Sequence, residues 1–293
     1  MRLNFLSKGD SDMHVLGKNI LNQIITTRPS ESHKGNYGRV LTVGGNSQFG
    51  GAIILATSAA IHCGAGLSTC ATSLDNLTAL HTIVPEAMFI PFDSEYKLID
   101  ALTTADVILV GPGLGTNEDS LKILQIVLQH TTPEQQLIID GSAITMIAEH
   151  HEFFPFLKKL HPILTPHQME WQRLSSIKIS EQDDIKNTLF QQKLQSTVVL
   201  KKYHTTIYHR DGSISQLAIG GPYMATGGMG DTLAGMIAGF LAQFKLKNYD
   251  YVVDAAVYAH SAIADKISTT KYVVLPTDII AEIQSFMKLS VTP

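Results

Sequence analysis

One short run limits what this chain can fold into: residues 225–231 read Ala-Thr-Gly-Gly-Met-Gly-Asp. Three glycines in four residues release the backbone from the usual φ/ψ limits, so the segment can curl closely around a ligand. An apolar pattern typical of a helix follows and extends to Ala242. The run therefore predicts a loop that leads into a helix N-terminus, where free N–H groups and the positive end of the helix dipole bind anions.

Asp231 closes this run, and we expect the helix start to hold its carboxylate ionised, pointing to where a phosphate would bind. The simpler interpretation is a helix cap, for which Asp is a favoured residue. A cap does not need three preceding glycines, however. We interpret the run as a phosphate-transfer site.

The composition indicates a globular enzyme that binds neither nucleic acid nor a membrane. Of the 293 residues, 44% are hydrophobic and 16% charged, which suits a sizeable core. A net charge of −4 with scattered Lys and Arg argues against nucleic acid as the partner. Residues 1–39 contain no apolar core like that of a signal peptide, and no run of 18 apolar residues occurs. Two cysteines, Cys63 and Cys70, are expected to be buried, reduced thiols of a cytoplasmic protein.

Short apolar strands bounded by glycine loops alternate with helices along the chain, which predicts an α/β fold with an open, mostly parallel sheet covered by helices on both faces. Hairpin signals near residues 200–215 predict antiparallel pairs late in the sheet. No linker or repeat occurs, so we expect one domain over residues 1–293. The expected strands are 40–43, 67–71, 88–90, 107–110, 137–140, 163–165, 197–201 and 205–208, and the expected helices are 15–25, 52–62, 75–81, 120–129, 229–242, 254–267 and 277–287.

Two common nucleotide motifs are absent. Residues 45–52 superficially look like a P-loop, but no Gly-Lys-Ser/Thr follows the glycines. The Gly-Pro-Gly-Leu-Gly run at 111–115 lacks the spacing of the dinucleotide fingerprint. A Walker-type NTPase and a Rossmann dehydrogenase are therefore rejected, and residues 111–115 are either a tight turn or part of a different pocket.

Residues 225–231 resemble the anion-hole and base motif of the ribokinase-like superfamily. Within it, four further segments resemble the ADP-dependent NAD(P)H-hydrate dehydratases and occur in that family's order over roughly residues 30–285. They are His-Lys-Gly-Asn-Tyr-Gly-Arg-Val at 33–40, Pro-Glu-Ala-Met at 85–88, Gly-Pro-Gly-Leu-Gly at 111–115 and Leu-Thr-Pro-His at 164–167. The resemblance implies a ribokinase-like fold without the separate lid domain of some sugar kinases.

The implied reaction is the repair of hydrated NADH or NADPH (NADHX, NADPHX). ADP would phosphorylate the ring hydroxyl with Mg²⁺ present, and loss of phosphate would give NAD(P)H and AMP. A cytoplasmic homo-oligomer is expected from the same resemblance. The rivals are a ribokinase-like kinase for a vitamin-precursor alcohol and a catalytically silent nucleotide sensor.

The resemblance also implies roles for individual residues. Asp231 would be the catalytic base. The residues that would bind a metal ion stay unidentified. The anion hole would consist of Gly227, Gly228, Met229 and Gly230. The hydrated dinucleotide would contact Ala52, Gly113, Gly115, His167 and Asp231. The adenine nucleotide would contact Lys201, Lys202, Tyr203, His204, Thr205 and Gly230.

Four positions need comment. His167 is expected to bind the substrate's phosphates or ribose, with Glu170 within its reach. Lys202 stands where the family usually has glycine, which puts the nucleotide preference in doubt. Ser142 leaves out an acidic group that is usual there. We expect His260, on an apolar helix, to be a core histidine.

Overall fold

The computed structural model describes residues 13–291, and its centre is a ten-stranded sheet in the order β1-β10-β9-β8-β7-β6-β5-β2-β3-β4. Only β9 runs antiparallel to its neighbours β8 and β10; the other pairs are parallel. The mostly parallel sheet with late antiparallel pairs is confirmed. The strands are β1 (Met13–Leu16), β2 (Arg39–Val43), β3 (Leu67–Thr72), β4 (Met88–Pro91), β5 (Val107–Val110), β6 (Gln136–Ile139), β7 (Ile163–Leu164), β8 (Thr197–Leu200), β9 (Thr206–Tyr208) and β10 (Ile214–Leu217).

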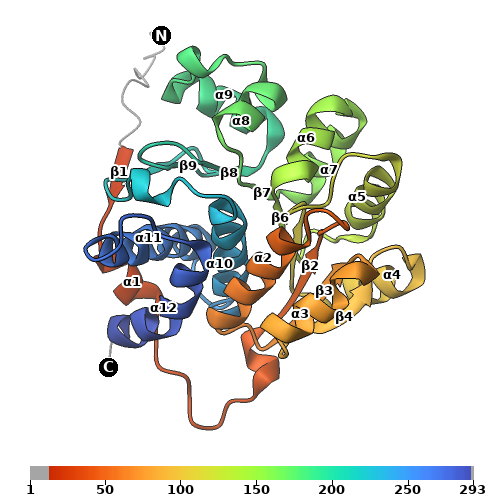
Figure 1. Cartoon of the computed structure of the whole chain (residues 1–293). Coiled ribbons are helices and arrows are strands. Elements are labelled where there is room, and N and C mark those ends of the chain that lie inside the picture. The colour runs from red at the N-terminus through yellow and green to blue at the C-terminus, as the bar shows by residue number, and fades with distance from the viewer. Residues whose placement is uncertain (1–12, 292–293) are drawn as a thin grey trace, which may run out of the picture.

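Helices cover both faces of this sheet, as expected (Figure 1). Side chains along a strand point alternately to the two faces, so Val40 packs into one core and Leu41 into the other. The first face carries α1 (Asn19–Ile24), α2 (Gly50–His62), α3 (Leu77–Ile83), α10 (Met229–Gln243), α11 (Tyr249–Ser268) and α12 (Pro276–Ser290). The second carries α4 (Glu95–Thr104), α5 (Glu118–His130), α6 (Gly141–Glu149), α7 (Phe154–Leu160), α8 (Gln168–Ser175) and α9 (Asp184–Leu194).

The expected helix at 15–25 is wrong in its first part. Residues 13–16 form β1, which pairs in parallel with β10, and a helix begins only at Asn19. The exposed edge of β10 offers hydrogen-bond partners that no local pattern reveals, and Gly17 separates the two elements. The two cysteines are free and buried, as expected, and burial raises the pKa of Cys70 to about 11.

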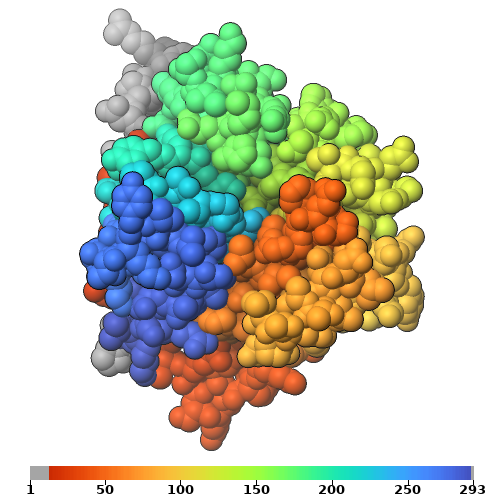
Figure 2. All heavy atoms as spheres, viewed as in Figure 1, coloured from red at the N-terminus to blue at the C-terminus, as the bar shows by residue number. Residues whose placement is uncertain are grey.

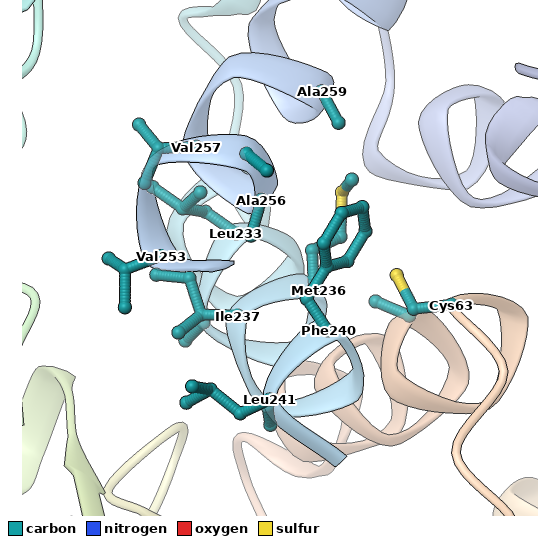
Figure 3. Close-up of a cluster of buried hydrophobic side chains, with 14 of the residues drawn as sticks. Cys63, Leu233, Met236, Ile237, Phe240, Leu241, Val253, Ala256, Val257 and Ala259 are labelled. Carbon is teal, nitrogen blue, oxygen red and sulfur yellow. The ribbon is translucent and has the colours of Figure 1, made fainter. Parts of the chain in front are cut away.

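Helix α10 packs on α2 with almost no side chain between them. A Cβ atom at Gly235 would lie 2.1 Å from the carbonyl oxygen of Ala56, and one at Gly239 would lie 2.6 Å from that of Ala60. The glycines are one helical turn apart, so they form a flat strip on one face of α10. Larger side chains of α10, including Met236 and Phe240, fill the space toward α11 and α2 (Figure 3). The position of α10 is therefore fixed by main-chain contact.

We expect Gly235→Ala to destabilise the protein, because the added Cβ meets main chain that cannot move aside alone. Overpacking costs about 1–3 kcal/mol, more than the gain of up to about 1 kcal/mol that alanine brings to a helix. Gly51→Ala is the matched control, because Gly51 is an exposed residue of α2 and nothing lies within 4 Å of its Cβ position. Denaturant unfolding should show a loss for the first variant alone; equal stabilities would contradict the close contact.

A buried histidine links the β9–β10 hairpin to α11. His209 Nδ1 lies 3.1 Å from an Asp250 carboxylate oxygen, and Nε2 lies 3.1 Å from one of Asp254. Burial alone would lower the pKa of His209, but its hydrogen bonds to the two aspartates outweigh burial and raise the pKa to about 9. The imidazolium is therefore the form that this fold stabilises at neutral pH.

This raised pKa predicts a loss of stability in alkali. A histidine whose folded pKa exceeds its unfolded value of 6.5 contributes its full stabilisation below pH 6.5 and loses it as the pH rises through about 9. The free energy of unfolding of the wild type, relative to His209→Gln, should fall by on the order of 3 kcal/mol between pH 6 and pH 10. Urea titrations at both pH values measure this, and an unchanged difference would mean that His209 is not charged in the fold.

Candidate active site

The predicted site loops meet at the carboxyl ends of the parallel strands, where β2 and β5 lie side by side. From β2 the chain continues to β3 on one side, whereas from β5 it continues to β6 on the other. Such a switch point leaves a crevice between the two outgoing loops. Segments far apart in the sequence also meet on this face in the space-filling view: the orange part around α2, the green part with α8 and the cyan part that follows β9 (Figure 2).

Main-chain contacts hold the two switch-point loops together. The Gly45 amide donates to the Pro112 carbonyl at 2.9 Å, and the Asn46 amide donates to that of Gly113 at 2.8 Å. A Cβ atom on Gly113, whose φ is +63°, would lie only 3.1 Å from the Cβ of Ala52. The structure thus brings together the predicted substrate residues Ala52 and Gly113.

Gly115 belongs to the same loop. Its φ is +87°, and its amide donates to the Ser142 hydroxyl at 3.1 Å. Ser142 stands where an acidic group is usual, and here it serves as a hydrogen-bond partner of the glycine loop. The glycine-proline run is therefore more than an isolated turn, because its neighbours on two other loops hold it.

The glycine run that the sequence predicts to bind an anion lies at the start of α10. Gly228 is the residue before the helix, and with φ of +89° its Cβ position would lie 2.5 Å from a methyl carbon of Leu55. Gly227 has nothing within 4 Å of its Cβ position and faces open space. The first amides of a helix have no partner within the helix, so those of Met229, Gly230 and Asp231 are available for an anion at this opening.

Lys201 places a positive charge at the same opening. Its Nζ lies 3.0 Å from the Cβ position of Gly230, so glycine at 230 leaves room for the ammonium. The ammonium pairs with Asp140 at 2.8 Å, and the same carboxylate oxygen accepts a 2.7 Å hydrogen bond from Thr165. Burial would lower the pKa of Lys201, but Asp140 and Glu170 outweigh burial and raise it. Lys201 is therefore a fixed cation beside the helix start.

Three carboxylates surround this one cation. Burial raises the pKa of Glu170 to about 7, with Asp140 adding to the rise and Lys201 opposing it. Burial likewise raises the pKa of Asp231 to about 6, and Asp140 again adds to it. The site therefore holds more negative charge than Lys201 neutralises, and Glu170 and Asp231 take up protons at higher pH than free carboxylates do.

The ionised state expected for Asp231 is compatible with its pKa, but this pKa is raised and not lowered. The helix dipole favours the carboxylate, but loss of water and the nearby Asp140 have the larger effect. With a pKa of about 6, Asp231 is mostly ionised at pH 7 yet more basic than an exposed aspartate. This suits a group that accepts a proton, since a base works best with a pKa near the operating pH.

His167 has a local role that the sequence does not announce. It is the residue before α8, and its Nδ1 accepts hydrogen bonds from the amides of Met169 and Glu170. Glu170 completes a capping box by accepting from the His167 amide at 2.8 Å, so the expected reach between these two residues is confirmed. Nδ1 is thus an acceptor, and burial and Lys201 lower the pKa of the ring, which leaves the proton of the neutral imidazole on Nε2.

The six residues predicted for the nucleotide line one cavity of about 700 Å³. They are Lys201, Lys202, Tyr203, His204, Thr205 and Gly230. His167, which the resemblance assigns to the hydrated dinucleotide, lines the same cavity and pairs with Lys201 as a parallel β-bridge.

The departure at Lys202 costs the backbone nothing, because Lys202 does not adopt a positive φ. The left-handed residue of this loop is His204 (φ +59°), whose ring stacks on Tyr203 at a centroid distance of 4.0 Å. Asp140, Thr165 and His260 belong to the site region although the sequence singles out none of them for it. The signal for Asp140 was its place directly after a strand at the carboxyl edge, where ligands bind.

Solved structures with the same arrangement define the class of this protein. It is similar to a ribokinase-like superfamily protein from Enterococcus faecalis V583, with a TM-score of 0.92 and 47% identity over the whole of both chains. It is also similar to the ADP/ATP-dependent NAD(P)H-hydrate dehydratase from Bacillus subtilis, co-crystallised with ATP and Mg²⁺, with a TM-score of 0.83 and 26% identity over 96% of this chain and 100% of that one. The fold is ribokinase-like.

The family follows from the sequence comparisons. A model of the NAD(P)H-hydrate dehydratase family matches residues 40–285. The ADP-dependent (S)-NAD(P)H-hydrate dehydratase of Enterococcus faecalis V583 is 48% identical over 281 residues, which cover 96% of this chain and 95% of that relative. The chain belongs to the NAD(P)H-hydrate dehydratase family.

The cap at His167 predicts which substitutions the fold tolerates. His167→Ala removes the acceptor for two amides and should lower the free energy of unfolding by about 1 kcal/mol. His167→Asn keeps a capping oxygen and should stay within about 0.5 kcal/mol of the wild type. Chemical denaturation compares the three proteins, and equal losses in both variants would show that the ring does more than cap the helix.

Proposed function

We propose that this protein is an ADP-dependent (S)-NAD(P)H-hydrate dehydratase that converts NADHX or NADPHX to NADH or NADPH, with AMP and phosphate as further products. The observation that carries the proposal is the position of Asp231 at the open start of α10. It directly follows Gly230, which lines the nucleotide cavity together with Lys201, at the carboxyl edge that also carries Gly113 and, in the first turn of α2, Ala52. Family membership supports the same reaction.

The residues divide the work of phosphoryl transfer. The amides at the start of α10 and the Lys201 ammonium would stabilise negative charge on the transferred phosphoryl group. Asp231 would orient the ring hydroxyl of the hydrated nicotinamide and accept its proton as the bond to phosphorus forms. The lone pair of the ring nitrogen then expels the phosphate, and loss of a proton from the adjacent ring carbon restores the ring double bond.

The acids of the site fit a magnesium ion that binds together with the nucleotide. Residues 13–291 contain no group of three or more His, Cys, Asp or Glu side chains arranged for a metal ion. Mg²⁺ commonly needs only one or two carboxylates besides phosphate and water ligands, and Asp140 and Glu170 would supply them. When bound, the ion would neutralise charge on the phosphates.

The single-domain, cytoplasmic and homo-oligomeric organisation expected from the sequence is part of this proposal. No helix within residues 13–291 is long and apolar enough to cross a membrane. The free, buried thiols are in keeping with a reducing compartment.

The direct test supplies NADHX, ADP and Mg²⁺ and follows absorbance at the band of reduced nicotinamide. We expect NADH and AMP to form in equal amounts, and ADP to be a better donor than ATP. Phosphorylation of a vitamin-precursor alcohol without any effect on NADHX would place the protein among the small-molecule kinases. Clear preference for ATP would change the donor and leave the reaction as proposed.

Asp231→Asn should abolish turnover while nucleotide binding stays within a few-fold, because the amide keeps the shape but cannot accept the proton. A general base contributes roughly 10²–10⁴-fold to the rate. A variant that retains a tenth or more of the wild-type rate would remove Asp231 from this role.

The pKa of about 6 at Asp231 also sets the pH dependence of the wild type. Activity should fall as the pH drops through about 6, because protonation removes the base. Values of kcat/KM between pH 5 and pH 8 measure this fall, because they report the pKa of the free enzyme. A rate constant that stays flat down to pH 5 would mean that another group takes the proton.

A further inference from the structure

The nucleotide cavity has an apolar end that the 201–205 loop does not form. Leu233 of α10 and Val257 of α11 lie side by side (Figure 3), and both line this cavity together with Ile219 and Met224. Val257, His260 and Ser261 follow one another at helical spacing, so one face of α11 presents two polar side chains within this apolar wall. A flat apolar slot with a few fixed polar groups is the usual way to hold a heterocycle. Phosphates belong at the other end, with Lys201 and Gly230.

The imidazole of His260 is buried and only half satisfied. It is 4% exposed, and its Nε2 has no hydrogen-bond partner among residues 13–291. Burial lowers the pKa of His260 to about 4. A hydrogen bond to the main chain of Met229 opposes this effect, as expected when a ring N–H donates to a carbonyl. The ring is therefore neutral at pH 7.

A neutral imidazole has one donor and one acceptor. Since the donor faces the main chain of Met229, the free nitrogen presents a lone pair and no proton. Leaving a buried polar atom unpaired costs free energy, so an atom of this kind calls for a partner that brings a hydrogen-bond donor. Ser261 differs, because a hydroxyl can rotate to donate or to accept.

Given the proposed function, in which this cavity binds ADP, we propose that His260 selects the base by accepting a hydrogen bond from the exocyclic amino group of adenine. The neighbouring ring nitrogen of adenine is an acceptor, which the Ser261 hydroxyl can satisfy. In hypoxanthine and guanine a carbonyl oxygen replaces the amino group, so two lone pairs would face each other at His260. Ser261 can adapt to either base, whereas His260, with its proton held at Met229, cannot. His260 is thus the specificity-determining residue, beyond the core role expected from its apolar helix.

Binding titrations with ADP, IDP and purine riboside 5′-diphosphate test this without the hydrated substrate. The last ligand carries hydrogen in place of the amino group, so it removes the donor without adding bulk or an acceptor. For the wild type we expect ADP to bind roughly ten- to a hundredfold more tightly than IDP, with purine riboside diphosphate between them. His260→Gln should reduce the ADP-to-IDP ratio to within about threefold, because an amide can turn to offer either a donor or an acceptor.

His209→Gln is the matched control, since His209 is as buried but lies outside this cavity. It should leave the ratio unchanged even if it lowers stability. Equal binding of ADP and IDP by the wild type, or an undiminished ratio in His260→Gln, would overturn the role of His260. The wild-type comparison with purine riboside diphosphate decides the matter if His260→Gln does not fold. Absence of any ADP binding would instead contradict the proposed function, so the two failures are distinguishable.

Discussion

The main-chain contact between α10 and α2 is the constraint on which the site depends. Gly235 and Gly239 allow α10 to approach the carbonyl groups of Ala56 and Ala60. Any side chain at these two positions would push the two helices apart. The same two helices begin at the two halves of the site: α10 at the anion opening and α2 at the loop of Asn46 and Ala52. Their contact therefore fixes the distance between the start of α10 and the start of α2 as rigidly as packed main chains allow.

The charges of the site are arranged for ligands that bring their own cation and anions. One lysine faces three acids, and burial has already raised the pKa values of Glu170 and Asp231. A nucleotide with Mg²⁺ adds both signs of charge, so it can pair with Lys201 and relieve the crowded carboxylates together. A bare phosphate would help Lys201 and the amides of α10 but would repel the acids. Under the proposed function, a complex of nucleotide and metal would therefore suit these charges better than either component alone.

Much of this arrangement is readable from the sequence, because local chemistry determined it. The glycine run contains a positive φ at Gly228, where a Cβ atom would also meet Leu55, and glycine adopts this conformation at no cost. Strands such as 107–110 are buried on both faces, and their unbroken runs of apolar residues make them recognisable in the sequence. β1 was not predicted because its partner strand lies about 200 residues away in the sequence. The raised pKa of Asp231 was not predicted because its causes, burial and the nearby Asp140, arise only in the tertiary structure. His167 resembled a ligand in the sequence, and its capping role depended on the direction of the ring.

The two ends of the nucleotide cavity use opposite physical means, and this difference separates affinity from selectivity. At the phosphate end, Lys201 and the amides of α10 act through charge, which attracts any nucleoside diphosphate regardless of its base. At the apolar end, a base that replaces water gains from burial, but burial alone distinguishes purines poorly. Discrimination there needs a polar atom that cannot adapt, and a neutral imidazole anchored to a main-chain carbonyl is such an atom. The anchor lies at Met229, in the first turn of α10, so the helix that opens toward the phosphate also orients the ring at the base.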